Sequence, residues 1–199
     1  ATHKYCLSQH DSSSADFYFA FNKSSFEIAN KNPFGISKNF IYGAPNRYKR
    51  QEGLFGIKKK YPVLFLSNKL YKGNSGGLST WSTDLDIAKT EIKILEVLNK
   101  TKKTVYYKNY PQSFKRYVDE DPCDKTIELK KKIKIIKSNH DARYMLSSAE
   151  LIICCSATST LSWAIMSNTP LIFINFSYIA PLKKEVELLL EKSIFLINF

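Results

Sequence analysis

Residues 151–161 read LIICCSATSTL, and this stretch decides the fold. Its first half, Leu151 to Cys155, is apolar at every position, which is typical of a strand buried on both faces in the middle of a parallel sheet. Its second half is a run of hydroxyl side chains before an apolar helical pattern, and Thr158 is well placed to cap that helix. The stretch therefore predicts a strand, a loop and a helix of an α/β protein.

Short apolar runs also occur on both sides of this strand, and amphipathic stretches separate them. The sequence predicts further strands at residues 63–67, 104–108, 133–136, 171–175 and 194–197. Strands that alternate with helices in this way form a doubly wound parallel sheet. We therefore predict a Rossmann-like parallel sheet of about six strands over residues 61–199. In the common strand order 3-2-1-4-5-6, strands one and four are neighbours, and ligands bind beyond their carboxyl ends.

Helix signals lie between the predicted strands. Thr83 begins a helix with an apolar stripe at intervals of three and four, formed by Leu85, Ala88, Ile92, Leu95 and Leu98. Asn139 or Asp141 caps a short helix before the central strand. The helix after Thr158 ends at residues 168–170, and Pro181 suits the first turn of a last helix with Leu182, Val186, Leu189 and Leu190 on one face.

Residues 1–60 have a different composition, which is rich in Ser, Asn, Phe and Lys. The sequence predicts a strand at 16–21, a short helix at 23–30 and a second strand at 39–43. We interpret residues 1–60 as the end of an N-terminal domain and a linker. The chain begins with Ala1 and stops at Phe199 within an apolar run, which favours a piece of a longer protein.

Composition excludes several classes of protein. The 44% hydrophobic content supports a core and excludes wholesale disorder, and no run of about 20 apolar residues or signal peptide is visible. The four cysteines form no C-x-x-C pair, so we expect reduced thiols in a reducing compartment. The three histidines share no metal spacing, and we expect neither a metal nor a cofactor.

Candidate ligand-binding residues follow the predicted strands. The strongest group is the hydroxyl run Ser156, Thr158, Ser159 and Thr160, because free N–H groups and the dipole at a helix start attract anions. The loop after the first strand offers Ser67, Asn68 and Lys72 beside glycines at 73, 76 and 77. This loop is neither a Walker A loop nor a dinucleotide fingerprint.

Five further residues complete the candidate set. Lys108 and Tyr110 follow the second strand, where a lysine can reach a diphosphate as a point charge. Asn139 and His140 follow the third strand and can lie near a base or ribose. His10 is the candidate catalytic base. Each group also has an alternative without a ligand. The hydroxyl run and residues 139–141 can simply cap helices, Lys108 can be a solvated lysine, and residues 67–77 can be a flexible loop.

These segments resemble the nucleotide-binding C-terminal half of GT-B glycosyltransferases over about residues 16–198. The likeness is greatest to bacterial surface-polysaccharide transferases of the CDP-glycerol glycerophosphotransferase-like and Kdo-transferase-like groups. Residues 105–111 are similar to the "K-P-H-P" strand end of that group, with Tyr110 in place of His, and Gly43-Ala44-Pro45 is similar to its "G-x-P". Residues 148–153, 156–161 and 168–173 continue the match. Ser162 stands where many GT-B enzymes have a ribose-binding Glu.

The resemblance implies a metal-independent transferase that acts on a nucleotide-activated sugar or polyol donor. The resemblance further implies a polysaccharide or lipid-linked acceptor and a cytoplasmic location, with peripheral binding to the inner membrane face. The formal net charge of +12 also attracts polyanions. A non-catalytic module that binds nucleotide or anionic membrane is therefore an alternative. Nucleic acid is the least favoured partner, because no RNA- or DNA-binding signature is present.

Overall fold

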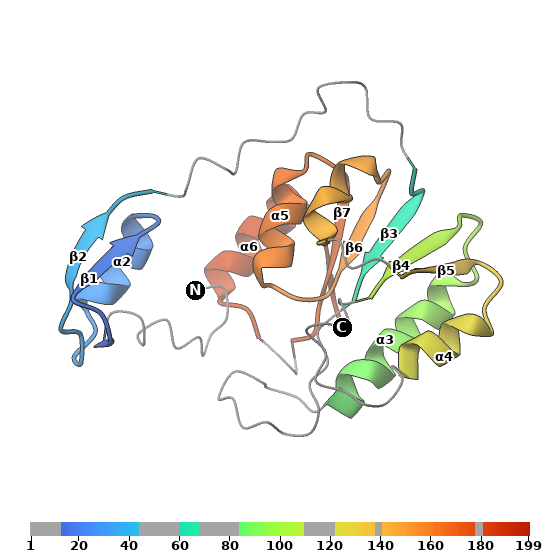
Figure 1. The fold of residues 1–199 in the computed structure, drawn as a ribbon, viewed down its shortest axis with the longest axis horizontal. Coiled ribbons are helices and arrows are strands. Elements are labelled where there is room, and N and C mark those ends of the chain that lie inside the picture. Colours follow the sequence, from blue (N-terminus) through green and yellow to red (C-terminus); the bar gives the residue numbers. More distant parts are fainter. Residues whose placement is uncertain (1–12, 44–59, 68–83, 110–121, 138–140, 178–180) are drawn as a thin grey trace. The chain divides into compact units, whose positions relative to one another are not determined.

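The computed structural model of the chain describes residues 13–43, 60–67, 84–109, 122–137, 141–177 and 181–199 (Figure 1). The chain divides into two compact units, residues 1–49 and 50–199, and each is described here by itself. The boundary that the sequence predicts after residue 60 stays a prediction.

The first unit is a strand–helix–strand element. Strand β1 (Phe17–Ala20) and strand β2 (Lys38–Ile41) pair in parallel, and helix α2 (Lys23–Asn30) connects them and packs against both. The Asn22 side chain caps α2 by accepting a hydrogen bond from the Ser25 N–H at 2.9 Å. The strand–helix–strand pattern predicted for this region is confirmed, with β2 beginning and ending slightly earlier than expected.

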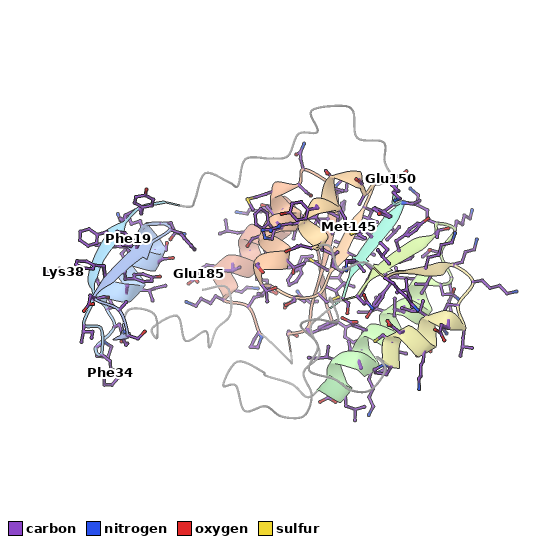
Figure 2. All side chains as sticks on the ribbon, viewed as in Figure 1. Phe19, Phe34, Lys38, Met145, Glu150 and Glu185 are labelled. Carbon is purple, nitrogen blue, oxygen red and sulfur yellow. The ribbon has the colours of Figure 1, made fainter. Side chains whose placement is uncertain are left out.

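Aromatic side chains form a row on this unit. The Phe19 ring stacks on Phe40 at 5.7 Å and meets Tyr42 edge-on at 6.0 Å, while Phe17 lies 6.4 Å from Phe40. All four rings are exposed, and Figure 2 labels Phe19 among them. Because successive side chains of a strand point to opposite sides, the row marks one face of the strand pair.

The second unit contains a six-stranded parallel sheet in the order β5-β4-β3-β6-β7-β8. Its strands are β3 (Val63–Leu66), β4 (Val105–Lys108), β5 (Ile133–Ile136), β6 (Ile152–Cys154), β7 (Leu171–Asn175) and β8 (Phe195–Asn198). The predicted α/β class and parallel sheet are confirmed, and the order is that of a Rossmann-like fold. The first and fourth strands, β3 and β6, are neighbours, with Leu64 opposite Ile152 and Leu66 opposite Cys154.

Helices flank both faces of this sheet (Figure 1). Helices α3 (Asp84–Leu98) and α4 (Pro122–Glu128) pack on one face, where Phe65, Leu95 and Tyr107 are buried. The other face carries α5 (Ser159–Met166), α6 (Lys184–Ser193) and the 3₁₀ turns η3 (Ala142–Tyr144) and η4 (Leu146–Ser148). The sheet is therefore buried on both sides, as its apolar strands require. None of the helices that the structure describes combines the length and apolarity needed to cross a membrane.

The starts of three helices differ from the predicted patterns. Leu85 is 61% exposed, so the α3 stripe does not begin there, and Thr83 lies outside the described residues. Asp141 does act as a cap, accepting from the Arg143 N–H at 2.9 Å, but it caps the 3₁₀ turn η3 and not an α-helix. Pro181 precedes α6, whose N-cap is Lys183, because the chain first buries Leu182.

The end of helix α5 follows the sequence closely, whereas the apolar stripe of α6 does so only in part. Helix α5 ends at Met166, and Asn168 then adopts a left-handed conformation with φ of 56°, which asparagine tolerates better than most residues. In α6, Leu190 is buried, but Leu189 is exposed although the predicted stripe included it. A helix on the outside of a sheet buries only the side chains that face the strands, so part of an apolar stripe remains in solvent.

Candidate functional site at the carboxyl edge of the sheet

The carboxyl ends of β3 and β6 bring two predicted ligand-binding segments to the same edge of the sheet. Ser67 directly follows β3, and Ser156 follows β6 by two residues; both side chains are half-buried. Because Leu66 lies opposite Cys154, the two loops leave the sheet from neighbouring positions. Asn68 and Lys72, predicted to extend the first loop, lie outside the described residues.

The hydroxyl run opens helix α5. Thr158 is the N-cap residue with an extended backbone, as predicted, but its side chain makes no capping hydrogen bond to the helix. Instead the Ser156 hydroxyl donates to the Thr158 hydroxyl at 3.4 Å. Thr158 and Ser159 are exposed, and Thr160 is half-buried. The start of α5 therefore combines the positive end of the helix dipole with hydroxyl groups on the surface.

Lys108 ends β4 and is buried, with only 3% of the residue exposed. Its ammonium group donates to the main-chain carbonyl of Asn109 at 2.9 Å. Lys108 lies opposite Leu66, so its side chain is on the sheet face that α5 covers. The alternative of a solvated lysine is wrong.

A buried carboxylate lies on the opposite face of the same edge. Glu91, in α3, is fully buried, and its Oε2 atom accepts from the Tyr107 hydroxyl at 2.8 Å and the Ser67 hydroxyl at 3.1 Å. The Tyr107 and Ser67 oxygens are themselves 2.8 Å apart. Sequence reasoning missed Glu91, because the stripe was drawn through apolar residues only. Its position, three residues after Ala88 and four before Leu95, was the signal.

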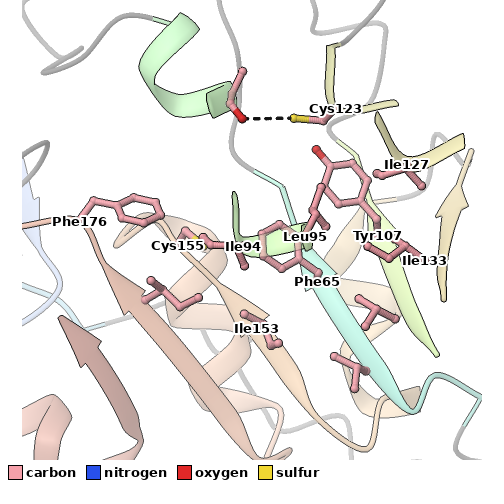
Figure 3. Close-up of a cluster of buried hydrophobic side chains, with 14 residues drawn as sticks. Phe65, Ile94, Leu95, Tyr107, Cys123, Ile127, Ile133, Ile153, Cys155 and Phe176 are labelled. Atoms are coloured by element: carbon pink, nitrogen blue, oxygen red, sulfur yellow. Dashed lines mark hydrogen bonds between the residues drawn. The ribbon is translucent and has the colours of Figure 1, made fainter. Parts of the chain in front are cut away.

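The described residues include three buried cysteines, of which Cys123 and Cys155 lie on the face that contains Glu91 (Figure 3) and Cys154 on the other face. The Cys123 thiol lies 3.9 Å from the main-chain oxygen of Ala88 and 3.8 Å from Glu91 Oε2. Burial raises the pKa of Cys154 to about 12. Burial also raises the pKa of Cys155 well above the usual thiol value, and the negative charge of Glu91 adds to this. The thiols of Cys154 and Cys155 are therefore neutral at pH 7 and are not poised as nucleophiles.

The structure does not describe the remaining predicted site residues. Tyr110, Asn139, His140 and the candidate base His10 all lie outside the described residues, as does Cys6. Within the described ranges, no group of three or more His, Cys, Asp or Glu side chains could hold a metal ion.

Comparisons with known proteins add no family assignment: no protein-family model matches the chain, and neither does any curated protein.

Proposed function

We propose that the chain is the nucleotide-binding half of a GT-B glycosyltransferase that transfers a sugar or glycerol-phosphate group to a growing bacterial surface polysaccharide. The supporting observation is the adjacency of β3 and β6, which places Ser67 and the run Ser156–Thr160 at one edge of a doubly wound sheet. Ligands of such sheets bind where the strand order reverses. The motif likeness over residues 105–111 and 156–161 supplies the choice of transferase.

The start of α5 is the phosphate-binding part of the proposed site. Its backbone N–H groups and the hydroxyls of Thr158, Ser159 and Thr160 hold the phosphates of the donor, and the helix dipole favours their charge. When the bond between the nucleotide and the transferred group breaks, the nucleotide leaves with additional negative charge. Hydrogen-bonding groups that are already in place around the leaving group stabilise the transition state more than they stabilise the substrate.

Lys108 and His10 have separate roles in the proposed reaction. The buried ammonium of Lys108 is an electrostatic partner for the leaving phosphate and needs no metal ion. His10 is our candidate for the base that takes the proton from the attacking acceptor hydroxyl. The acceptor is a polysaccharide or lipid-linked chain, which places the protein in the cytoplasm at the inner membrane surface. The basic net charge of +12 favours that anionic surface.

Calorimetric titration of the full chain with CMP-, CDP-, UDP- and GDP-linked donors tests this function. We expect one donor to bind and the double variant S159A/T160A to lose at least about tenfold in affinity, because hydrogen bonds to a charged group are removed. The matched control is Ser193→Ala, which removes an exposed hydroxyl at the far end of α6.

Two outcomes contradict the proposal. One is a folded protein that binds none of the four donors; the other is donor affinity that is the same in S159A/T160A as in the wild type. Pelleting with anionic vesicles in the absence of nucleotide affinity supports the non-catalytic, membrane-binding module instead. Retention on RNA at near-physiological ionic strength supports a nucleic-acid-binding protein.

A further inference from the structure

The two edges of the six-stranded sheet differ in charge. Strand β5 forms one edge and strand β8 forms the other. The β5 edge has exposed lysines within the strand and beside it, namely Lys131, Lys132, Lys134 and Lys137. The β8 edge has no charged side chain from Ser193 to Phe199. Lysines on an edge strand discourage pairing with another chain, so this sheet is protected at β5 and not at β8.

The backbone of β8 offers hydrogen bonds to a further strand. The Phe199 N–H donates to the Asn175 carbonyl of β7 at 2.9 Å. Successive residues of a strand direct their N–H and C=O groups to opposite sides, so Leu196 and Asn198 direct theirs away from β7. Among the described strands none lies on that outer side of β8. A strand that pairs there would satisfy these groups.

Strand β8 also exposes apolar side chains on one face. Ile197 lies opposite Ile174 of β7, which belongs to the apolar cluster on the face under α3 and α4. Because side chains alternate along a strand, Phe195 and Phe199 point to the same face as Ile197. The exposed fractions are 70% for Phe195, 47% for Ile197 and 51% for Phe199. A strand added at this edge places its own side chains beside these three.

We propose that β8 pairs in the antiparallel direction with β8 of a second copy of this chain, across a twofold axis that passes at Ile197 perpendicular to the sheet. In this register Leu196 of one copy lies opposite Asn198 of the other, so the outward backbone groups of both residues are hydrogen-bonded. Ile197 lies opposite Ile197, and Phe195 lies opposite Phe199. The inference is independent of the proposed function.

The chemistry of the edge favours a second copy as the partner. Antiparallel pairing of β8 with itself joins apolar side chains to apolar side chains and brings no like charges together. The same operation at β5 would place the lysines around Lys134 beside those of the other copy. A twofold axis perpendicular to the sheet also keeps each face on its own side. The exposed residues of the two copies therefore form one continuous apolar patch.

The size of this patch sets the expected strength of the dimer. Phe195, Ile197 and Phe199 together expose roughly 300 Å² per copy, because a large side chain of this kind presents about 150–250 Å² when it is fully exposed. Standard interfaces bury about 800 Å² per partner. We therefore expect a dimer that forms at high protein concentration and dissociates on dilution.

Sedimentation equilibrium of the full chain, from micromolar to submillimolar concentration, tests the dimer. We expect a monomer–dimer equilibrium for the wild type. Ile197→Lys should weaken association at least about tenfold, because two like charges then meet at the axis. Ile165→Lys is the matched control: Ile165 is 44% exposed on α5, and this variant should associate as the wild type does. Circular dichroism of each variant checks that it is folded.

A mixture of two oppositely charged variants makes the test specific to the axis. Ile197→Glu alone should be as weakly associated as Ile197→Lys. An equimolar mixture of the two variants should recover the dimer, because opposite charges then face each other across the strand pair. Neither a damaged fold nor a change in net charge alone produces such recovery.

Disulfide formation tests the register. Opposed residues at a non-hydrogen-bonded antiparallel position have Cα atoms about 4.5 Å apart, within the range of a disulfide. With oxidised glutathione as the oxidant, Ile197→Cys should form a covalent dimer. Phe195→Cys should not, because the proposed register places Phe195 opposite Phe199. The wild type, with its own four cysteines, measures the background.

Several outcomes overturn the inference. One is a wild type that stays monomeric at every concentration. Another is a dimer that persists in both Ile197→Lys and Ile197→Glu, since association then uses a different surface. A mixture of these variants that stays monomeric, or equal cross-linking of Phe195→Cys and Ile197→Cys, contradicts the twofold axis at Ile197. Failure to bind any nucleotide, with the dimer intact, overturns only the proposed function.

Discussion

The two faces of the central sheet bury different polar groups. The face under α5 and α6 is packed with apolar side chains such as Leu64, Ile152 and Phe173, and its buried lysine, Lys108, stands at the end of β4. The face under α3 and α4 has a comparable apolar cluster, but the fully buried carboxyl group of Glu91 and the Tyr107 hydroxyl lie within it. Packing therefore dominates the middle of the first face, and the second face combines packing with hydrogen bonds between buried groups.

The largest expected effect comes from a cavity on the face under α5 and α6. Phe173 is almost fully buried in β7, so Phe173→Ala removes a large side chain and leaves a cavity. We expect the free energy of unfolding to fall by about 3–5 kcal/mol, measured by denaturant titration. Ile165→Ala, at an exposed site on α5, should change it by less than about 1 kcal/mol. Equal losses in the two variants would contradict a core centred on Phe173.

A smaller effect isolates the hydrogen bonds of the other face. In the structure the Tyr107 ring stacks on Phe65 with 5.6 Å between the ring centres. Tyr107→Phe keeps this ring and removes only the hydroxyl that donates to Glu91. We expect a loss of about 1–3 kcal/mol, because buried Glu91 loses a donor. Tyr106→Phe is the matched control, since its half-buried ring points to the opposite face. If both variants are equally stable, the Tyr107 hydroxyl does not contribute to folding.

The smallest effect compares the thiols on the two faces as pH rises. Cys154 faces the α5 side, and burial raises its pKa from 9.0 to about 12 in the folded state. Unfolded thiols ionise first, so this stabilisation is complete below about pH 9 and is lost progressively as pH rises toward 12. At about pH 10 we expect wild type to have lost roughly 1 kcal/mol relative to Cys154→Ala, by denaturant titration at each pH.

The same comparison extends to Cys155, on the face that contains Glu91. Burial is the main cause of its raised pKa, and the Glu91 charge acts in the same direction. Both thiols should therefore react slowly with iodoacetamide in the native protein at pH 8 and rapidly once it is unfolded. Rapid modification of either thiol in the native state would show that it is not buried.

The sequence predicted the sheet well because strand signals are local. Each apolar run needed only its own residues and the breaks around it, and the strand order followed from a general rule for alternating strands and helices. Thus β5 and β7 have the predicted bounds, and the neighbouring positions of Ser67 and Ser156 follow from the order. These features follow from the apolar pattern of the strands and from the right-handed connections between parallel strands.

The buried polar groups could not be predicted in the same way. A periodicity that counts apolar residues treats Glu91 as an interruption, although the helix places it between Ala88 and Leu95 on the buried side. Lys108 was expected at a strand end, but its burial depends on which face that last residue takes. Partners distant in sequence, such as Tyr107 for Glu91, decide whether a buried charge is tolerated, and no local pattern contains them.

The central strand pair also has a consequence for how the protein folds. β3 and β6 are neighbours in the sheet although β4, β5 and several helices separate them along the chain. Contacts between distant segments form slowly, because closing the large loop between them costs chain entropy before the contact stabilises the fold. The loops that begin at Ser67 and Ser156 therefore reach neighbouring positions only when this long-range pairing is made. A nascent chain that ends before β6 holds just one side of the edge at which we place the ligand.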